Sequence, residues 1–167
     1  MALVIREAHG GLELLFIRRA VFAGDPWSGQ VAFPGGRHEP GDASLTHTAM
    51  RETHEELHLD LARDGRLLGT LDDLAPRTPA LPPIVVRPFV FAVQGDLTLT
   101  LSHEVADAFW VPLPVLGAPE TSAESVVEVR GMRIRVPSFR HGDHVIWGMT
   151  ERMLRQFMEV IVPRLPL

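Results

Sequence analysis

Apolar residues along this chain occur in short runs separated by turn residues, and two of these runs lie near its start. Residues 2–5 and 12–17 predict strands joined by a glycine-containing turn. A third, short strand is expected at 31–33. The most apolar run, residues 84–93, predicts a buried strand, and Pro88 within it favours a bulge or an edge position.

Two other stretches have the period of a helix. Residues 43–58 place Met50, Thr53 and Leu57 on one side, and residues 150–162 carry a comparable apolar face. The remaining predicted elements are a strand at 67–71, a short helical turn at 102–109, a strand at 110–113, a hairpin over 126–136 and a strand at 144–147. A proline-rich loop is predicted at 72–83, where it would form a wall or lid over a site. This order of strands and helices predicts an α/β fold in which a mixed sheet lies between helices, an α/β/α layering.

The composition fits a single globular domain spanning residues 1–167. The net charge of −5 lacks the basic footprint of nucleic-acid-binding proteins, so no nucleic-acid partner is expected. The absence of cysteine excludes disulfides, thiolate zinc sites and cysteine nucleophiles. No run approaches the roughly 18 apolar residues of a membrane span, so a soluble, cytoplasmic protein without a membrane partner is expected. Because the first strand begins abruptly at residue 2, a segment preceding this sequence is expected.

Three glutamates share one side of the helix predicted at 43–58. Glu52, Glu55 and Glu56 fall within an arc of roughly 100°. Like charges three and four residues apart repel each other, and such groups also occur on solvated helix faces. A hard divalent cation turns the repulsion into attraction, since Mg²⁺ prefers carboxylates, waters and phosphate oxygens.

Residues around the glutamates favour a metal platform over a solvated face. The glycine pair at 35–36 permits a positive φ or a close approach of the backbone. Asp42 or Ser44 supplies an N-cap for the helix. Arg51 lies one turn before Glu55, close enough to hold that carboxylate through charge-assisted hydrogen bonds. The sequence therefore predicts a site for Mg²⁺ or Mn²⁺ on this helix.

The segment resembles the Nudix box, whose pattern is Gly, five residues, Glu, seven residues, then Arg-Glu-apolar-x-Glu-Glu-x-Gly-apolar. The residues that match are Gly36, Arg51, Glu52, Thr53, Glu55, Glu56 and Leu59. Gly36 and Arg51 are one residue further apart than in the pattern, and the upstream acid is Asp42 or Glu39. His58 stands where the pattern has its late glycine.

The longer gap resembles the coenzyme A pyrophosphatase branch of the Nudix family. Residues 27–36 are similar to the upstream signature of that branch, in which Gly29 would close the approach loop. Residues 14–18, 103–113 and 146–150 are similar to further stretches of the branch. The loop after Arg18 is longer than in the branch, and Arg19 is the nearby substitute for its second arginine.

This resemblance implies a Nudix-like α/β/α sandwich and hydrolysis of the pyrophosphate bond of a nucleoside diphosphate derivative, with Mg²⁺ or Mn²⁺ as cofactor. Coenzyme A, cleaved to 3′-phosphoadenosine 5′-phosphate and 4′-phosphopantetheine, is the substrate it favours. Glu52 and Glu56 would be the main metal ligands, with Glu55 and the Gly36 carbonyl as further ones. Glu52 or Glu104 would take the proton from the attacking water.

The resemblance also implies roles for the basic residues. Arg51 would orient Glu55 without touching the substrate, and Arg18 or Arg19 would pair with the 3′-phosphate of coenzyme A. The expected partner is then a small-molecule substrate. The resemblance does not fix the oligomeric state, for which a homodimer is one option.

Three alternatives remain open from the sequence. ADP-ribose or dinucleoside polyphosphate hydrolysis differs only in substrate, and a Nudix-like domain that merely binds its ligand would normally lack one of the glutamates. The third is a zinc peptidase, because His54-Glu55-x-x-His58 matches H-E-x-x-H. Its extended form would need glycine and histidine where Leu61 and Asp64 stand.

Overall fold

The structure is a computed structural model that describes residues 1–76, 83–95, 97–129 and 131–161. Its helices are α1 (Leu45–Leu57), α2 (Leu61–Asp64), α3 (Leu113–Gly117) and α4 (Gly148–Ile161), with a 3₁₀ turn at Pro119–Thr121. Its strands are β1 (Ala2–Ala8), β2 (Gly11–Arg19), β3 (Val31–Ala32), β4 (Gly65–Thr70), β5 (Phe89–Val93), β6 (Val105–Pro112), β7 (Ser122–Val129), β8 (Met132–His141) and β9 (His144–Trp147).

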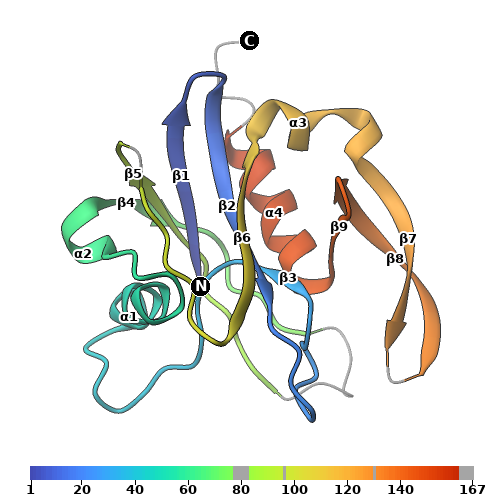
Figure 1. Cartoon of the computed structure of the whole chain (residues 1–167), viewed down its shortest axis with the longest axis horizontal. Helices are drawn as coiled ribbons and strands as arrows, with labels where there is room; N and C mark the ends of the chain where they lie inside the picture. The colour runs from blue at the N-terminus through green and yellow to red at the C-terminus, as the bar shows by residue number, and fades with distance from the viewer. Residues whose placement is uncertain (77–82, 96, 130, 162–167) are drawn as a thin grey trace.

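Strand β2 organises the larger of the two sheets. It pairs antiparallel with β1 and β3 along one edge and with β6 along the other. Beyond β1 the sheet continues with β5, in parallel, and then with β4. The strands β7, β8 and β9 form a smaller antiparallel sheet, which lies with α4 on the opposite side of the molecule from α1 (Figure 1).

The alternation of side chains along β1 and β2 produces two buried cores, one on each face of the larger sheet. Leu3 and Phe16 belong to the cluster that residues of α4 close, whereas Val4 and Leu15 belong to the cluster that residues of α1 and α2 close. Figure 1 shows α1 and α4 on opposite sides of this sheet. The predicted α/β/α layering around a mixed sheet is therefore confirmed.

Most predicted elements are present, several with different ends. The predicted strand at 144–147 coincides with β9, and the hairpin predicted over 126–136 is part of the longer β7–β8 hairpin. The helix predicted at 43–58 is α1, and the one predicted at 150–162 is α4. The short helix α2 was not predicted; Asp60 caps it by accepting hydrogen bonds from two backbone N–H groups.

The helical turn predicted at 102–109 is wrong, because most of that stretch belongs to β6. Pairing with the free edge of β2, where Leu15 lies opposite Trp110, decides its conformation. The strand predicted at 84–93 is also shorter, and before β5 only Val86 forms an isolated bridge, with Leu74. The wall or lid predicted at 72–83 includes residues 77–82, which lie outside the described residues.

Candidate functional site

Both ends of α1 are fixed by capping interactions. Ser44 caps the first turn, and its Oγ accepts a hydrogen bond from the His47 backbone N–H at 3.1 Å. At the other end, His58 adopts the left-handed conformation with φ +54°, and its backbone N–H donates to the His54 carbonyl. Within the described ranges His58 is the only non-glycine residue with a positive φ. The N-cap, predicted as Asp42 or Ser44, is therefore Ser44.

Glu56 is the buried member of the three glutamates, with 4% of its surface exposed. Its Oε2 accepts a hydrogen bond from the Gly35 backbone N–H at 2.9 Å. Gly35 has φ +139°, and a Cβ there would lie 2.7 Å from the Met1 Cα, so this position requires glycine. Burial raises the pKa of Glu56 to about 8, and the charge of Glu52 adds to the effect.

Glu52 packs against the second glycine of the pair. A Cβ on Gly36 would come within 2.3 Å of the Glu52 Oε1, so the backbone approaches the carboxylate closely. Burial raises the pKa of Glu52, while the charge of Arg51, whose Nη2 lies 3.1 Å from Oε1, opposes the increase. Of the two predicted reasons for glycine, positive φ applies to Gly35, and close approach of the backbone applies to both residues.

Arg51 connects the loop before α1 to the acidic side of the helix. Its Nε and Nη2 donate to the two carboxylate oxygens of Asp42, at 2.9 and 3.0 Å, and its Nη1 donates to Glu55 at 3.0 Å. The Asp42 side chain is 1% exposed and also accepts from the Thr48 hydroxyl and the Glu39 backbone N–H. Arg51 holds the pKa of Asp42 well below its usual range. The predicted Arg51–Glu55 contact is confirmed, whereas the buried role of Asp42 was not predicted.

Glu55 is the most exposed of the three, with 56% of its side chain accessible and its carboxylate turned toward Arg51. Among the described residues, no three histidine, aspartate or glutamate side chains converge closely enough to hold a metal ion. The donor chemistry nevertheless fits a hard divalent cation. Glu52 and Glu56 offer carboxylate oxygens, and their pKa values are raised mainly by burial and further by the charges of neighbouring glutamates.

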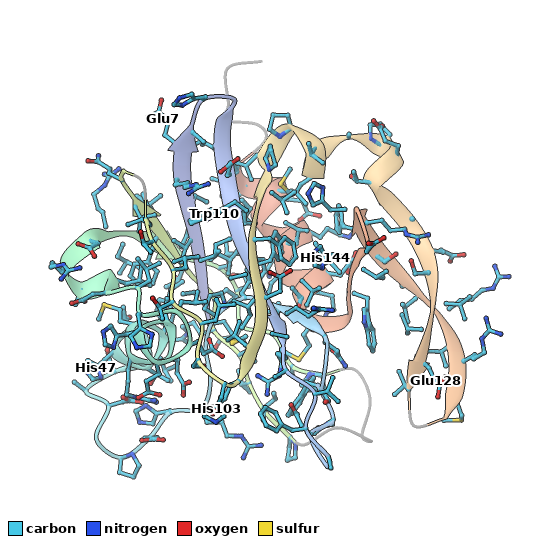
Figure 2. The ribbon with its side chains drawn as sticks, in the orientation of Figure 1. Glu7, His47, His103, Trp110, Glu128 and His144 are labelled. Atoms are coloured by element: carbon cyan, nitrogen blue, oxygen red, sulfur yellow. The ribbon has the colours of Figure 1, made fainter. Side chains whose placement is uncertain are left out.

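Glu104 joins these residues from the turn that precedes β6. Its carbonyl accepts a hydrogen bond from the Ala20 backbone N–H at 2.8 Å. Burial is the main reason for the raised pKa of Glu52 and of Glu56, and the charge of Glu104 contributes to both. Figure 2 shows the neighbouring His103 at the lower end of β6.

Arg18 and Arg19 are adjacent on β2, but their side chains have different neighbours. The Nη2 of Arg19 donates to Asp25 at 2.8 Å, and its charge opposes the raised pKa of Glu56, so Arg19 belongs with the glutamates. Its Nε is buried and has no hydrogen-bond partner. Arg18 instead lines a cleft of about 510 Å³, as does Gly29, whose φ of +71° turns the loop there.

The cleft lies between the loop before β3 and the smaller sheet. Its other lining residues are Asp25, Pro26, Ser28, Gln30, Val31, Glu128, Val129, Asp143, His144, Val145 and Trp147. Figure 2 labels Glu128 on the β7–β8 hairpin and His144 at the start of β9, both on the small-sheet side of the cleft. Sequence patterns alone did not indicate this wall, because its residues come from strands far apart along the chain.

The geometry of α1 does not support a zinc site made by His54 and His58. His58 lies in the left-handed C-cap position, outside the regular helix, and its Nδ1 is 3.0 Å from the Thr100 carbonyl. The intervening Glu55 pairs with Arg51. The two imidazoles lie close together, with ring centroids 5.9 Å apart, but the His58 Nδ1 and the Glu55 carboxylate are already engaged by other groups.

Known proteins are similar to this chain in sequence and in architecture. The model of the NUDIX domain matches residues 1–129. The human mitochondrial coenzyme A diphosphatase NUDT8 is 29% identical over 94% of this chain and 66% of its own length. A Photorhabdus laumondii protein, the uncharacterized Nudix hydrolase NudL, is 33% identical over 80% of this chain and 70% of its own length. The chain thus spans about two thirds of the length of these curated relatives.

Similarity to solved structures concerns the fold. The NUDIX domain of Shewanella oneidensis NrtR, solved with ADP-ribose, superposes with a TM-score of 0.56 at 17% identity, over 96% of this chain and 84% of that one. None of the helices in the described part of the chain combines the length and hydropathy needed to cross a bilayer.

The match to the domain model over most of the sequence, together with the glutamates and glycines on and before α1, leads to one assignment. The chain belongs to the Nudix hydrolase family.

Proposed function

We propose that the chain hydrolyses the pyrophosphate bond of a nucleoside diphosphate derivative, and that this substrate is coenzyme A. The observation that carries the proposal is the pair of partly desolvated, coupled carboxylates of Glu52 and Glu56 on α1. The likeness to a curated coenzyme A diphosphatase supports the choice of substrate. The products would be 3′-phosphoadenosine 5′-phosphate and 4′-phosphopantetheine.

Nudix hydrolases generally use divalent metal ions, and we propose Mg²⁺ or Mn²⁺ for this chain. Glu52 and Glu56 would hold the ion, with Glu55 and the Gly36 carbonyl as further ligands. Once bound, the ion supplies positive charge for the pyrophosphate oxygens and the attacking water. Because Glu55 is paired with Arg51, the ion and the guanidinium would compete for that carboxylate.

The remaining chemistry is a proton transfer performed by the protein. A water oxygen attacks one phosphorus, the bond from that phosphorus to the bridging oxygen breaks, and a proton of the water passes to a carboxylate oxygen. We propose Glu104 as this base, because Glu52 is paired with Arg51 and serves the metal. Within the described residues the recorded ion pair of Glu104 is with His103, at 4.0 Å, the outer limit of such a contact.

The cleft beside β2 would receive the rest of the substrate. Its volume of about 510 Å³ suits one nucleotide-sized arm, and Arg18 offers a guanidinium on its wall. We propose that Arg18, rather than Arg19, pairs with the 3′-phosphate, because Arg19 is already held by Asp25. Gly29 would keep the entrance loop turned away from this arm.

A substrate panel tests the proposal directly. The protein is incubated with Mg²⁺ or Mn²⁺ and coenzyme A, ADP-ribose, diadenosine polyphosphates or nucleoside triphosphates, and the products are identified by mass. We expect coenzyme A to be cleaved to the two products named above, by the wild-type protein and not by the Glu52→Gln variant. Intact coenzyme A at millimolar concentration would reject the substrate, and inactivity on every compound would reject hydrolysis and leave a ligand-binding domain.

ADP-ribose is the second candidate substrate. The structurally similar NUDIX domain of NrtR was solved with ADP-ribose, and that ligand contains the same pyrophosphate linkage without a 3′-phosphate. Cleavage of ADP-ribose with coenzyme A left untouched would keep the proposed chemistry and replace the proposed substrate.

A further inference from the structure

His58 occupies a backbone conformation that favours glycine, yet it is not glycine. Its φ of +54° lies in the left-handed region, where a Cβ is disfavoured. A residue that tolerates this conformation at lower cost, such as glycine or asparagine, would end α1 equally well. The imidazole therefore calls for a role of its own.

The imidazole contacts the segment that leads to Glu104. The Nδ1 of His58 donates to the Thr100 carbonyl at 3.0 Å, since a carbonyl oxygen can only accept. The Thr100 backbone N–H in turn donates to the Leu57 carbonyl, also at 3.0 Å. Thr100 is thus held by both of its backbone polar groups, one of them through the His58 side chain.

Two further hydrogen bonds hold the residues between Thr100 and Glu104 in place. The Ser102 backbone N–H donates to the Glu56 carbonyl at 2.9 Å. The Ser102 Oγ then accepts from the Glu104 backbone N–H at 3.3 Å. The segment is therefore fastened to the last turn of α1, where Glu56 presents its carboxylate, and Glu104 is also held from the residue after β2, through the Ala20 N–H.

We propose that His58 is a positioning residue for hydrolysis: by holding Thr100 it sets Glu104 against the carboxylates of Glu52 and Glu56. This inference rests on the proposed function, in which Glu104 takes the proton from water. A tether of this kind affects the rate of the chemical step more than substrate affinity, because the base must lie within hydrogen-bond reach of the water.

Two substitutions at position 58 separate the side-chain contact from the backbone conformation. Glycine and asparagine both tolerate the left-handed conformation, so neither is expected to disrupt the end of α1. The Nδ2 of asparagine occupies nearly the place of the imidazole Nδ1 and also donates, whereas glycine has no donor. His58→Gly and His58→Asn therefore differ chiefly in the hydrogen bond to Thr100, and His54→Ala is a matched control that leaves this bond in place.

The first measurement is steady-state kinetics on the substrate that the wild-type protein cleaves. His58→Gly should lower kcat by about 10-fold or more with KM changed less than about twofold, while its melting temperature stays at or above that of the wild type. His58→Asn should regain most of the lost kcat, and His54→Ala should match the wild type. In a Glu104→Gln background, His58→Gly should produce no further loss. Wild-type kcat in His58→Gly, or no recovery in His58→Asn, would overturn the proposal.

A second measurement does not depend on activity. Hydrogen–deuterium exchange should be faster in residues 97–104 of His58→Gly than in the wild type or His58→Asn, with the start of α1 unchanged. Unchanged exchange in that segment would disprove the tether even in an active enzyme. A wild-type protein inactive on the whole panel would instead reject the proposed hydrolysis, whatever the exchange result.

Discussion

At the scale of single residues, Glu56 shows how the fold prepares a carboxylate for a cation. Burial raises its pKa to about 8, although the Gly35 N–H and the charge of Arg19 act in the opposite direction. An ionised Glu56 is therefore destabilising in the metal-free protein. A cation that binds the ionised form would remove this penalty, and the free energy released would contribute to metal affinity.

Glu56→Gln is expected to stabilise the metal-free protein at pH 8 and to change its stability little at pH 5. The folded pKa of about 8 lies above the ordinary value of 4.5. The stabilising contribution of the bound proton is therefore complete below pH 4.5 and is lost as the pH rises through 8. Glutamine keeps an acceptor for the Gly35 N–H without the charge. Thermal unfolding in EDTA at both pH values measures the difference.

The same substitution should abolish most turnover when metal is present. Both Glu56→Gln and Glu52→Gln are expected to lower kcat by about 100-fold or more, because each removes a proposed metal ligand. Near-normal activity in either variant, or a Glu56→Gln protein that is less stable at pH 8, would contradict the assigned role.

Arg18→Gln should distinguish coenzyme A from dephospho-coenzyme A. If the guanidinium pairs with the 3′-phosphate, the substitution lowers kcat/KM for coenzyme A by about 10-fold, as expected for a lost charge-assisted hydrogen bond. Dephospho-coenzyme A lacks that phosphate, so its kcat/KM should change little. An equal loss with both substrates would place Arg18 elsewhere on the ligand.

At the scale of elements, the loop between β3 and α1 is joined to the helix by Asp42. This nearly inaccessible carboxylate accepts from two nitrogens of Arg51 and from Thr48, one turn earlier on α1. Arg51 then reaches Glu55 with its remaining terminal nitrogen. The loop therefore controls the orientation of the acidic side of the helix through one arginine.

A double-mutant cycle on Asp42 and Arg51 tests this connection. Asp42→Ala and Arg51→Ala should each lower the melting temperature and kcat, because each leaves the other partner without its main counter-charge. The double variant should lose less than the sum of the two single losses. Additive losses would mean that the two residues act independently.

At the scale of the whole molecule, the larger sheet separates the glutamates of α1 from the cleft beside the smaller sheet. Its α1 side carries the glutamates and Arg19, whereas Arg18 opens onto the cleft beside the smaller sheet. In the proposed function, the pyrophosphate would lie at the end of β2, where these two surfaces meet. Metal binding at α1 should then be detectable in the global stability of the protein.

Adding Mg²⁺ or Mn²⁺ to EDTA-treated protein should raise its melting temperature and restore activity, and Zn²⁺ should not substitute for either. A ligand at 100 times its Kd contributes about 2.7 kcal/mol of stability. The Glu52→Gln variant is the matched control and should show a much smaller shift. Loss of activity in His54→Ala, restored only by Zn²⁺, would instead favour the metallopeptidase interpretation.

Elements with a strong local signal could be predicted from the amino-acid sequence. The short apolar runs of β1 and β2 and the helical period of α1 depend on neighbouring residues, so these elements were predictable. The same holds for the glutamates, whose spacing along α1 fixes their common side, and for the glycine pair at 35 and 36, which was expected to permit a positive φ or a close approach. The contact between Arg51 and Glu55 follows from one turn of helix.

Features that depend on pairing between distant segments arise only when the chain is folded. A helical turn was predicted at 102–109, but residues 105–109 belong to β6. Their backbone groups pair with the free edge of β2, and this pairing outweighs the local preference for a helical turn. The burial of Asp42, the contact of His58 with Thr100 and the wall formed by Glu128 and His144 each join parts of the chain that no local pattern relates. Charge and burial at such contacts arise only when the chain is folded, which is why the raised pKa of Glu56 could not be predicted from its sequence position.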